Sequence, residues 1–129
     1  MTFNILGLNH NTAPLIIRER LAFSNEETLD ALNEINAIES VNEVVILSTC
    51  NRSELYLNSD EKGLAQVKAW LIKYKDINEE TVAHLFTKSG EEAINHISRV
   101  ACGLDSMILG EPQILGQLKE AFRTAQESG

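Results

Sequence analysis

The residue whose type and setting best suit catalysis is Cys50, in the polar stretch Ser-Thr-Cys-Asn-Arg at 48–52. This stretch follows the continuous apolar run at 44–47, which is typical of a buried strand. The sulfur is therefore expected at a strand end, where it can reach a cleft. The thiolate is the nucleophilic form of cysteine, and a cation such as Arg52 stabilises it. The alternative is a free, buried thiol without a catalytic role.

A second candidate is His96, which falls at the edge of an apolar stripe on a predicted helix. Gly103 lies on nearly the same face of that helix, so the imidazole could form the wall of a cleft that a substrate enters. The alternative is a half-buried histidine satisfied by a neighbour. Cys102, on the same predicted helix, is interpreted as a structural thiol, and neither cysteine has nearby partners for a metal site.

Several polar residues gather at the predicted start of the last helix, namely Ser106, Glu111, Gln113 and Gln117. Glu111 could bind an ammonium group, and the N–H groups that follow Pro112 at the helix start could bind a carboxylate. The alternative is that these residues cap the helix. No glycine-rich loop of the G-x-G-x-x-G type follows a predicted strand, so a nicotinamide cofactor would have to be bound elsewhere.

Hydrophobic periodicity predicts the elements that must position these residues. Strands are predicted at 2–9, 44–47, 54–58 and 86–87, the third of them alternating and half exposed. A short amphipathic segment is expected at 14–21, and helices at about 25–38 after a Ser24–Glu27 capping box, at 64–74, at 78–85, around 93–104 and from Pro112 onward. Leu29 and Ile94 are expected on the inner faces of their helices.

The resulting order is β-α-β-β-α-β followed by two helices, which predicts an α+β fold. We expect a small, mostly antiparallel sheet with helices packed on one face, in the ferredoxin-like arrangement, and then two C-terminal helices. The 129 residues fit one domain, and 43% of them are hydrophobic, which is enough for a core.

Charge and composition exclude several classes of protein. The formal charge of −8 argues against a general nucleic-acid binder, which gains its affinity from Lys and Arg on phosphates. Six acids and no Lys or Arg lie within 21–51, a stretch that should face water or a basic partner. No apolar run is long enough for a membrane span, no secretory signal is visible, and two cysteines are too few for a disulfide framework. A cytoplasmic location is therefore expected.

Three separated segments together resemble one enzyme family, glutamyl-tRNA reductase. The first is Gly-Leu-Asn-His-Asn-Thr-Ala-Pro at 7–14 with Arg18 and Glu19 after it, and the second is Ser-Thr-Cys-Asn-Arg-Ser-Glu-Leu-Tyr at 48–56. The third runs from His-Ile-Ser-Arg-Val-Ala-Cys-Gly-Leu-Asp-Ser-Met at 96–107 on through Gly-Glu-Pro-Gln-Ile-Leu-Gly-Gln at 110–117. Their order and spacing are specific, and they span nearly the whole chain.

The resemblance implies a reaction in which the Cys50 thiolate attacks the ester carbonyl of glutamyl-tRNA(Glu) and keeps the glutamyl group as a thioester. NADPH then reduces the thioester to glutamate-1-semialdehyde, the precursor of 5-aminolevulinate and so of porphyrins, heme and other tetrapyrroles. By motif position, the resemblance makes His96 important for activity and assigns substrate contacts to Thr49, Asn51, Arg52, Ser106, Glu111, Pro112, Gln113 and Gln117. A glutamate substrate needs an arginine for its side-chain carboxylate and an acid or carbonyls for its ammonium group. Arg52 and Glu111 are the hypotheses for these roles.

The resemblance also implies a domain order. Residues 1–129 resemble an N-terminal catalytic domain, which in the family is followed by an NADPH-binding Rossmann domain and a helical dimerisation domain. We therefore expect this chain to form the thioester without reducing it, and to be a monomer where the full-length enzyme is a homodimer. Glutamate-1-semialdehyde aminomutase is the implied protein partner, and no metal, flavin or membrane association is implied.

Two other interpretations of the sequence stay open. In one, the acidic helix at 25–38 binds a basic partner and Cys50 is inert. In the other, Cys50 and His96 form the dyad of a cysteine hydrolase. Faster alkylation of Cys50 than of Cys102 would favour an enzyme over the binding module. Activity on simple thiol-protease or ester substrates would favour the hydrolase.

Overall fold

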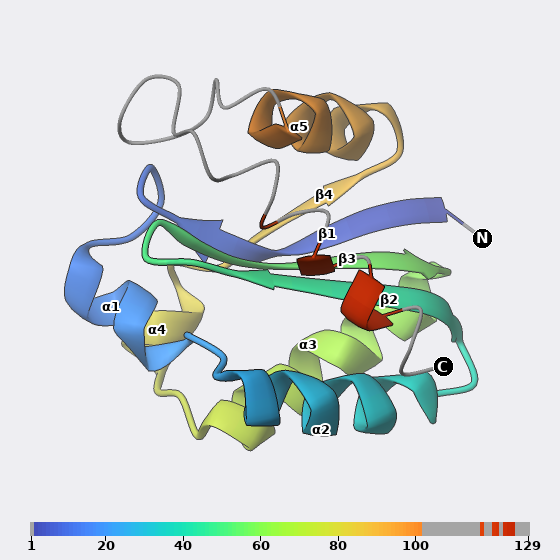
Figure 1. The fold of residues 1–129 in the computed structure, drawn as a ribbon, viewed down its shortest axis with the longest axis horizontal. Helices are drawn as coiled ribbons and strands as arrows, with labels where there is room; N and C mark the ends of the chain where they lie inside the picture. Colours follow the sequence, from blue (N-terminus) through green and yellow to red (C-terminus); the bar gives the residue numbers. More distant parts are fainter. Residues whose placement is uncertain (1, 102–116, 118–119, 122, 126–129) are drawn as a thin grey trace.

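The computed structural model describes residues 2–101, 117, 120, 121 and 123–125 of the chain. Its sheet consists of β1 (Thr2–Asn9), β2 (Val41–Ser48), β3 (Arg52–Ser59) and β4 (Phe86–Ser89). The strands lie in the order β2-β3-β1-β4, and each pairs with its neighbour in the antiparallel direction (Figure 1). This is the strand order of a ferredoxin-like βαββαβ fold, so the predicted α+β fold class is confirmed; the last predicted helix, from Pro112 onward, lies largely outside the described residues.

The helices around the sheet are α1 (Leu15–Arg20), α2 (Asn25–Asn36), α3 (Glu61–Lys75), α4 (Glu79–Val82) and α5 (Glu91–Ala101). The predicted capping box begins α2: the Ser24 hydroxyl accepts from the Glu27 N–H at 3.1 Å, and the Glu27 carboxylate accepts from the Ser24 N–H at 3.0 Å. Such contacts satisfy N–H groups that a helix start leaves without partners. Within the described residues, no helix is both long and apolar enough to cross a membrane.

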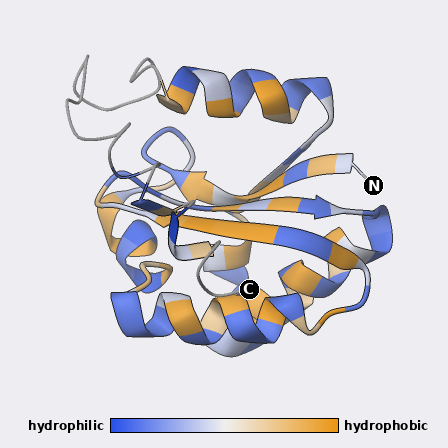
Figure 2. Ribbon diagram, turned by 45° about the vertical axis from the view of Figure 1, so that its right-hand side comes forward, coloured by the Kyte–Doolittle hydropathy of each residue, from blue (hydrophilic) through white to orange (hydrophobic). Residues whose placement is uncertain are grey.

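Helices cover both faces of the sheet, so the expectation of helices on one face is wrong. On the side of α2 and α3, the core includes Leu6, Leu8, Leu32, Leu55, Leu57 and Val67. On the opposite face, under α5, it consists of Ile5, Val45, Leu47, Tyr56, Ala93 and Val100 (Figure 1). Because successive residues of a strand point to opposite faces, the strands must carry apolar residues at consecutive positions. Figure 2 shows such apolar stretches along the strands.

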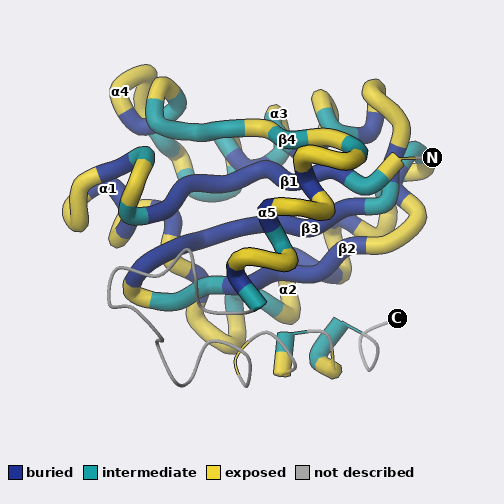
Figure 3. Tube along the Cα trace, turned by 90° about the horizontal axis from the view of Figure 1, so that it is seen from above, coloured by how far each residue is buried: buried dark blue, intermediate teal, exposed yellow. Residues whose placement is uncertain are grey.

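Strand β3 differs from its prediction. The sequence predicts an alternating, half-exposed strand at 54–58, but the strand begins at Arg52 and is buried along nearly its whole length (Figure 3). The reason is its position, because β3 lies between β2 and β1 and both of its faces are covered by helices. Arg52, predicted in the preceding turn, is consequently a buried strand residue.

Two apolar residues predicted to face the core lie at the surface instead, because Leu29 is 48% and Ile94 is 53% exposed. The buried positions of α2 are Ala31, Leu32 and Ile35. Those of α5 are Ala93, His96 and Val100. The inner face of α5 is thus rotated relative to its apolar stripe, and the rotation brings His96 against the sheet.

The outer strand β2 begins with an irregularity. Its register with β3 shifts between Val41 and Glu43, which is a β-bulge. Asn42 and Glu43 are both exposed at this place.

Candidate active site

Cys50 lies in the short turn that joins β2 to β3. The turn is closed by a hydrogen bond from the Thr49 N–H to the Arg52 carbonyl at 2.8 Å. Inside it, the Asn51 N–H donates to the Thr49 hydroxyl at 3.1 Å. Cys50 is a free, exposed thiol. The sulfur is therefore within reach of a reactant, as the sequence predicts for a cysteine at a strand end.

Arg18 of α1 holds this turn from outside. Its Nε donates to the Cys50 carbonyl at 3.2 Å, and its Nη1 donates to the Ala13 carbonyl at 2.8 Å. Arg18 is buried, so the guanidinium joins two backbone carbonyls largely out of contact with water. A planar guanidinium with fixed donor directions is suited to such a bridge. The backbone of the candidate nucleophile is thereby tied to α1.

A buried polar cluster lies just along β3 from the turn and is centred on Glu54, which is fully buried. Its Oε2 lies within hydrogen-bond distance of His96 Nε2, at 2.7 Å, and accepts from Arg52 Nη1 at 3.3 Å and from Asn9 Nδ2 at 3.4 Å. Its Oε1 accepts from the Tyr56 hydroxyl at 2.6 Å. One carboxylate therefore gathers a histidine, an arginine, a tyrosine and an asparagine from three elements, namely β1, β3 and α5.

Strand geometry explains how the cluster assembles. Arg52, Glu54 and Tyr56 are two residues apart, so they share one face of β3. Tyr56 belongs to the core under α5, and α5 supplies His96 to that same face. The Phe86 ring packs against the imidazole in a T-shaped arrangement, with ring centroids 5.5 Å apart.

Gly7 provides the space for Glu54. The two residues face each other in the β1–β3 pairing. A Cβ atom at Gly7 would lie 2.4 Å from the Ser53 carbonyl oxygen and 3.1 Å from Cγ of Glu54. No real side chain tolerates the first distance, so a residue larger than glycine would displace β3 at the centre of the cluster.

The charge state of Glu54 follows from its partners. Burial works against the charged form, but the hydrogen bond from His96, the positive charge of Arg52 and the hydrogen bond from Tyr56 act in the opposite sense. Together they hold the pKa of Glu54 below its ordinary value of 4.5. Glu54 is accordingly a carboxylate at neutral pH, and it compensates the buried charge of Arg52.

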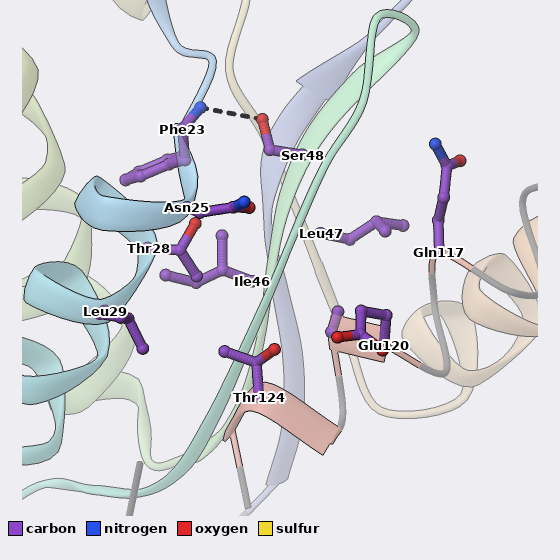
Figure 4. Close-up of a pocket in the computed structure, with 11 residues that line it drawn as sticks. Phe23, Asn25, Thr28, Leu29, Ile46, Leu47, Ser48, Gln117, Glu120 and Thr124 are labelled. Atoms are coloured by element: carbon purple, nitrogen blue, oxygen red, sulfur yellow. Dashed lines mark hydrogen bonds between the residues drawn. The ribbon is translucent and has the colours of Figure 1, made fainter. Parts of the chain in front are cut away.

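The predicted site residues fall into three groups. Thr49, Asn51 and Arg52 share the turn or the strand start with Cys50, and His96 joins them through Glu54. Gln117 is exposed and lines a separate cavity of about 440 Å³ between α2 and the edge of β2 (Figure 4). Four further predicted site residues, Ser106, Glu111, Pro112 and Gln113, lie outside the described part of the chain, and so does Cys102, which is interpreted as a structural thiol.

Sequence reasoning missed Glu54, Asn9 and Tyr56 as members of the site and assigned no role to Arg18. The signal for Glu54 is its spacing from Arg52 and Tyr56 on a strand paired with an apolar one. Because β3 was predicted to be half exposed, Glu54 was expected to face water. Its spacing from Arg52 and Tyr56 was therefore not interpreted as a buried cluster. Among the described residues, no group of three or more His, Cys, Asp or Glu is placed to hold a metal ion.

The fold and the site define a class: a ferredoxin-like domain that carries an exposed cysteine on a strand-joining turn, beside a buried Arg–Glu–His cluster. The sequence model of the family described as "Glutamyl-tRNAGlu reductase, N-terminal domain" matches residues 6–129. The chain belongs to this family.

Individual relatives agree with this assignment. The chain is 48% identical over 130 residues to a glutamyl-tRNA reductase of Ectopseudomonas mendocina, in a match that covers 100% of this chain and 30% of the relative. It is also 48% identical to that of Pseudomonas aeruginosa strain PAO1, over 100% of this chain and 31% of the relative. The solved glutamyl-tRNA reductase from Methanopyrus kandleri superposes with a TM-score of 0.76 and 28% identity, over 98% of this chain and 29% of that one. The chain thus spans about 30% of the length of these relatives.

Proposed function

We propose that this domain carries out the acyl-transfer half of the glutamyl-tRNA reductase reaction. In this step the Cys50 sulfur attacks the ester carbonyl of glutamyl-tRNA(Glu), the carbon–oxygen bond to the ribose breaks, and a glutamyl thioester forms. The thiol proton ends on the released ribose hydroxyl. The observation that carries the proposal is the exposed free thiol of Cys50, in the segment that resembles the catalytic motif of the family.

The chemistry suits the surroundings of Cys50. An aminoacyl ester is already activated, so a thiolate can attack it without a strong base beside the sulfur. Arg18 fixes the backbone of the turn through the Cys50 carbonyl. A nucleophile held in one position loses less entropy when it reaches the transition state.

Substrate recognition is assigned by motif position. Arg52, whose side chain is fully buried without substrate, binds the side-chain carboxylate of the glutamyl group once substrate binding uncovers it, and Glu111 binds its ammonium group. A guanidinium has five N–H donors, and Glu54 engages Nη1 of Arg52. We propose that this salt bridge with Glu54 holds the Arg52 guanidinium in one orientation for the substrate carboxylate. Further substrate contacts are proposed for Thr49, Asn51, Ser106, Pro112, Gln113 and Gln117.

The reduction that completes the reaction uses the hydride that NADPH supplies, and it yields glutamate-1-semialdehyde for tetrapyrrole synthesis. The described residues do not fit a nicotinamide-binding site of the Rossmann type. Such a site needs a glycine-rich turn between a strand and a helix. The strand-to-helix connections of the described residues, at 10–14, 60 and 90, contain a single glycine, Gly90. We therefore assign only thioester formation to this chain.

Mass spectrometry of the intact domain after mixing with glutamyl-tRNA(Glu) tests the proposal. We expect a covalent glutamyl adduct that is lost in Cys50→Ser and kept in the matched control Cys102→Ser. An adduct that survives in Cys50→Ser, or no adduct on the folded wild-type domain, would refute the assignment of Cys50.

A further inference from the structure

We propose that Glu54 is a positioning residue that sets which nitrogen of His96 exchanges protons. Glu54 accepts the Nε2–H of the imidazole, so Nδ1 is the ring nitrogen that takes or gives a proton. For its role in the reaction this inference rests on the proposed function. The position of the ring proton itself is a property of the folded domain.

The first step of the argument concerns hydrogen-bond direction. The 2.7 Å contact joins His96 Nε2 to Oε2 of Glu54, and both side chains are buried. An ionised carboxylate can only accept hydrogen bonds. The imidazole must therefore donate, which places a proton on Nε2 in both the neutral and the charged ring.

The second step concerns how firmly the carboxylate is held. Its other oxygen accepts from the Tyr56 hydroxyl at 2.6 Å, and Arg52 and Asn9 donate to the oxygen that contacts His96. These donors engage both oxygens of the carboxylate and hold it in one orientation against the imidazole. Rotation of Glu54 would break several buried hydrogen bonds, each of which costs about 1–3 kcal/mol when left unsatisfied.

The charged groups around the ring support the same arrangement. From β3 the ring meets Glu54, with Arg52 and Tyr56 behind it. From β1 comes the neutral Asn9, and from β4 comes Phe86, whose ring is contacted in turn by Lys88. The charged neighbours on α5 are Glu92 and Arg99, both of which are exposed. Among the described residues, Glu54 is the carboxylate in contact with the imidazole.

The consequence for the reaction concerns the proton that leaves Cys50. This proton must reach the ribose oxygen as the carbon–sulfur bond forms and the carbon–oxygen bond breaks. Nε2 is committed to Glu54, so Nδ1 is the atom of His96 that would hand a proton to the ribose oxygen, a step that alkylation of Cys50 does not need. Glu54 itself touches no reacting atom in this scheme and acts through the imidazole.

NMR of the ¹⁵N-labelled domain tests the inference directly. Long-range ¹H–¹⁵N spectra distinguish the two ring nitrogens, and His96→Asn identifies the His96 signals against those of His10 and His84. At a pH where the ring is neutral, we expect the proton of His96 on Nε2 in the wild-type domain. A neutral His96 with its proton on Nδ1 would overturn the inference, whether or not any variant folds.

Two variants extend the test. Glu54→Gln replaces an obligatory acceptor by an amide that can also donate, so the neutral ring should become a mixture of both tautomers. Tyr56→Phe is the matched control, because it removes a partner of Glu54 but leaves the His96 contact, and it should keep the Nε2 proton. An unchanged tautomer in a folded Glu54→Gln domain would contradict the inference.

The reaction supplies a readout that a purely structural role would not move. In Glu54→Gln, the rate of glutamyl adduct formation should fall by about 10- to 100-fold, and its pH profile should shift. The rate at which iodoacetamide alkylates Cys50 should stay within about twofold of wild type. If the wild-type domain forms no adduct, the proposed function fails, while the NMR result still decides the role of Glu54. A wild-type pH profile in Glu54→Gln would count against Glu54.

Discussion

At the scale of single residues, the candidate site depends on the buried cluster in which Glu54 contacts Asn9, Arg52, Tyr56 and His96. Cys50 and His96 could be proposed as site residues from the sequence because their side chains are chemically distinctive. Glu54 was not, since its partners Asn9 and His96 are 45 and 42 positions away in the chain. Only the pairing of β1 with β3 and the docking of α5 bring them together, and no local pattern reports either event.

Gly7→Ala should destabilise the domain, because its methyl group would lie 2.4 Å from the Ser53 carbonyl oxygen. Overpacking of this kind costs about 1–3 kcal/mol, measurable by urea denaturation, and adduct formation at Cys50 should fall as Glu54 moves.

Gly90→Ala is the control: Gly90 has a positive φ of 60°, and a methyl group there would meet nothing within 4 Å. It should cost about 1–2 kcal/mol of backbone strain and leave adduct formation intact. Equal loss of activity in both variants would contradict this expectation.

The ionisation of Glu54 predicts a pH dependence of stability. Its pKa in the folded domain lies below the ordinary 4.5, so its contribution is fully present above that ordinary value. The contribution is lost as the pH falls through the lower, folded pKa. The free energy of unfolding of wild type should therefore approach that of Glu54→Gln as the pH is lowered from about 7 to about 3. A difference between the two proteins that stays constant over this range would be inconsistent with the lowered pKa.

Alkylation separates the enzyme from the binding module. The exposed Cys50, on a turn held by Arg18, should react with iodoacetamide at neutral pH much faster than Cys102. Peptide mapping after short exposure measures both rates in one sample. Equal, slow labelling of the two cysteines would favour an inert thiol and a domain that acts through its acidic helix.

At the scale of elements, the strand order and helix pattern were predictable, but burial was not. The Ser24–Glu27 capping box and the alternation of apolar residues are local signals, and the elements they predict are present. Whether a strand is central depends on its neighbours in space. Hence the local pattern predicts a half-exposed β3, although the strand is buried. It also predicts Ile94 on the inner face of α5, although His96 is buried there and Ile94 is exposed.

Arg18→Ala tests the tie between α1 and the turn that carries Cys50. Loss of the guanidinium leaves the Cys50 and Ala13 carbonyls without this donor, which should cost about 1–3 kcal/mol. It should also slow adduct formation several-fold and speed amide exchange at 49–52. Arg20→Ala is the matched control on the same helix, because Arg20 bonds the Thr81 hydroxyl instead. Similar exchange rates in the two variants would show that Arg18 does not hold the turn.

At the scale of the whole molecule, the domain should form the glutamyl thioester but should not reduce it. Incubated with glutamyl-tRNA(Glu) and NADPH, it should form the thioester at Cys50 and slowly hydrolyse it to glutamate. Liquid chromatography with mass spectrometry can measure free glutamate and glutamate-1-semialdehyde together. Aldehyde that depends on NADPH would show that this chain reduces the thioester by itself.

The bulge between Val41 and Glu43 has a consequence for behaviour at high concentration. An outer strand presents unpaired backbone groups on which a strand of another molecule can add, and this is a common start of aggregation. On β2 the irregular step and the exposed carboxylate of Glu43 interrupt that row of groups. The domain should for this reason resist growth of intermolecular sheets along β2, and removal of the extra residue Asn42 should make it prone to fibre formation.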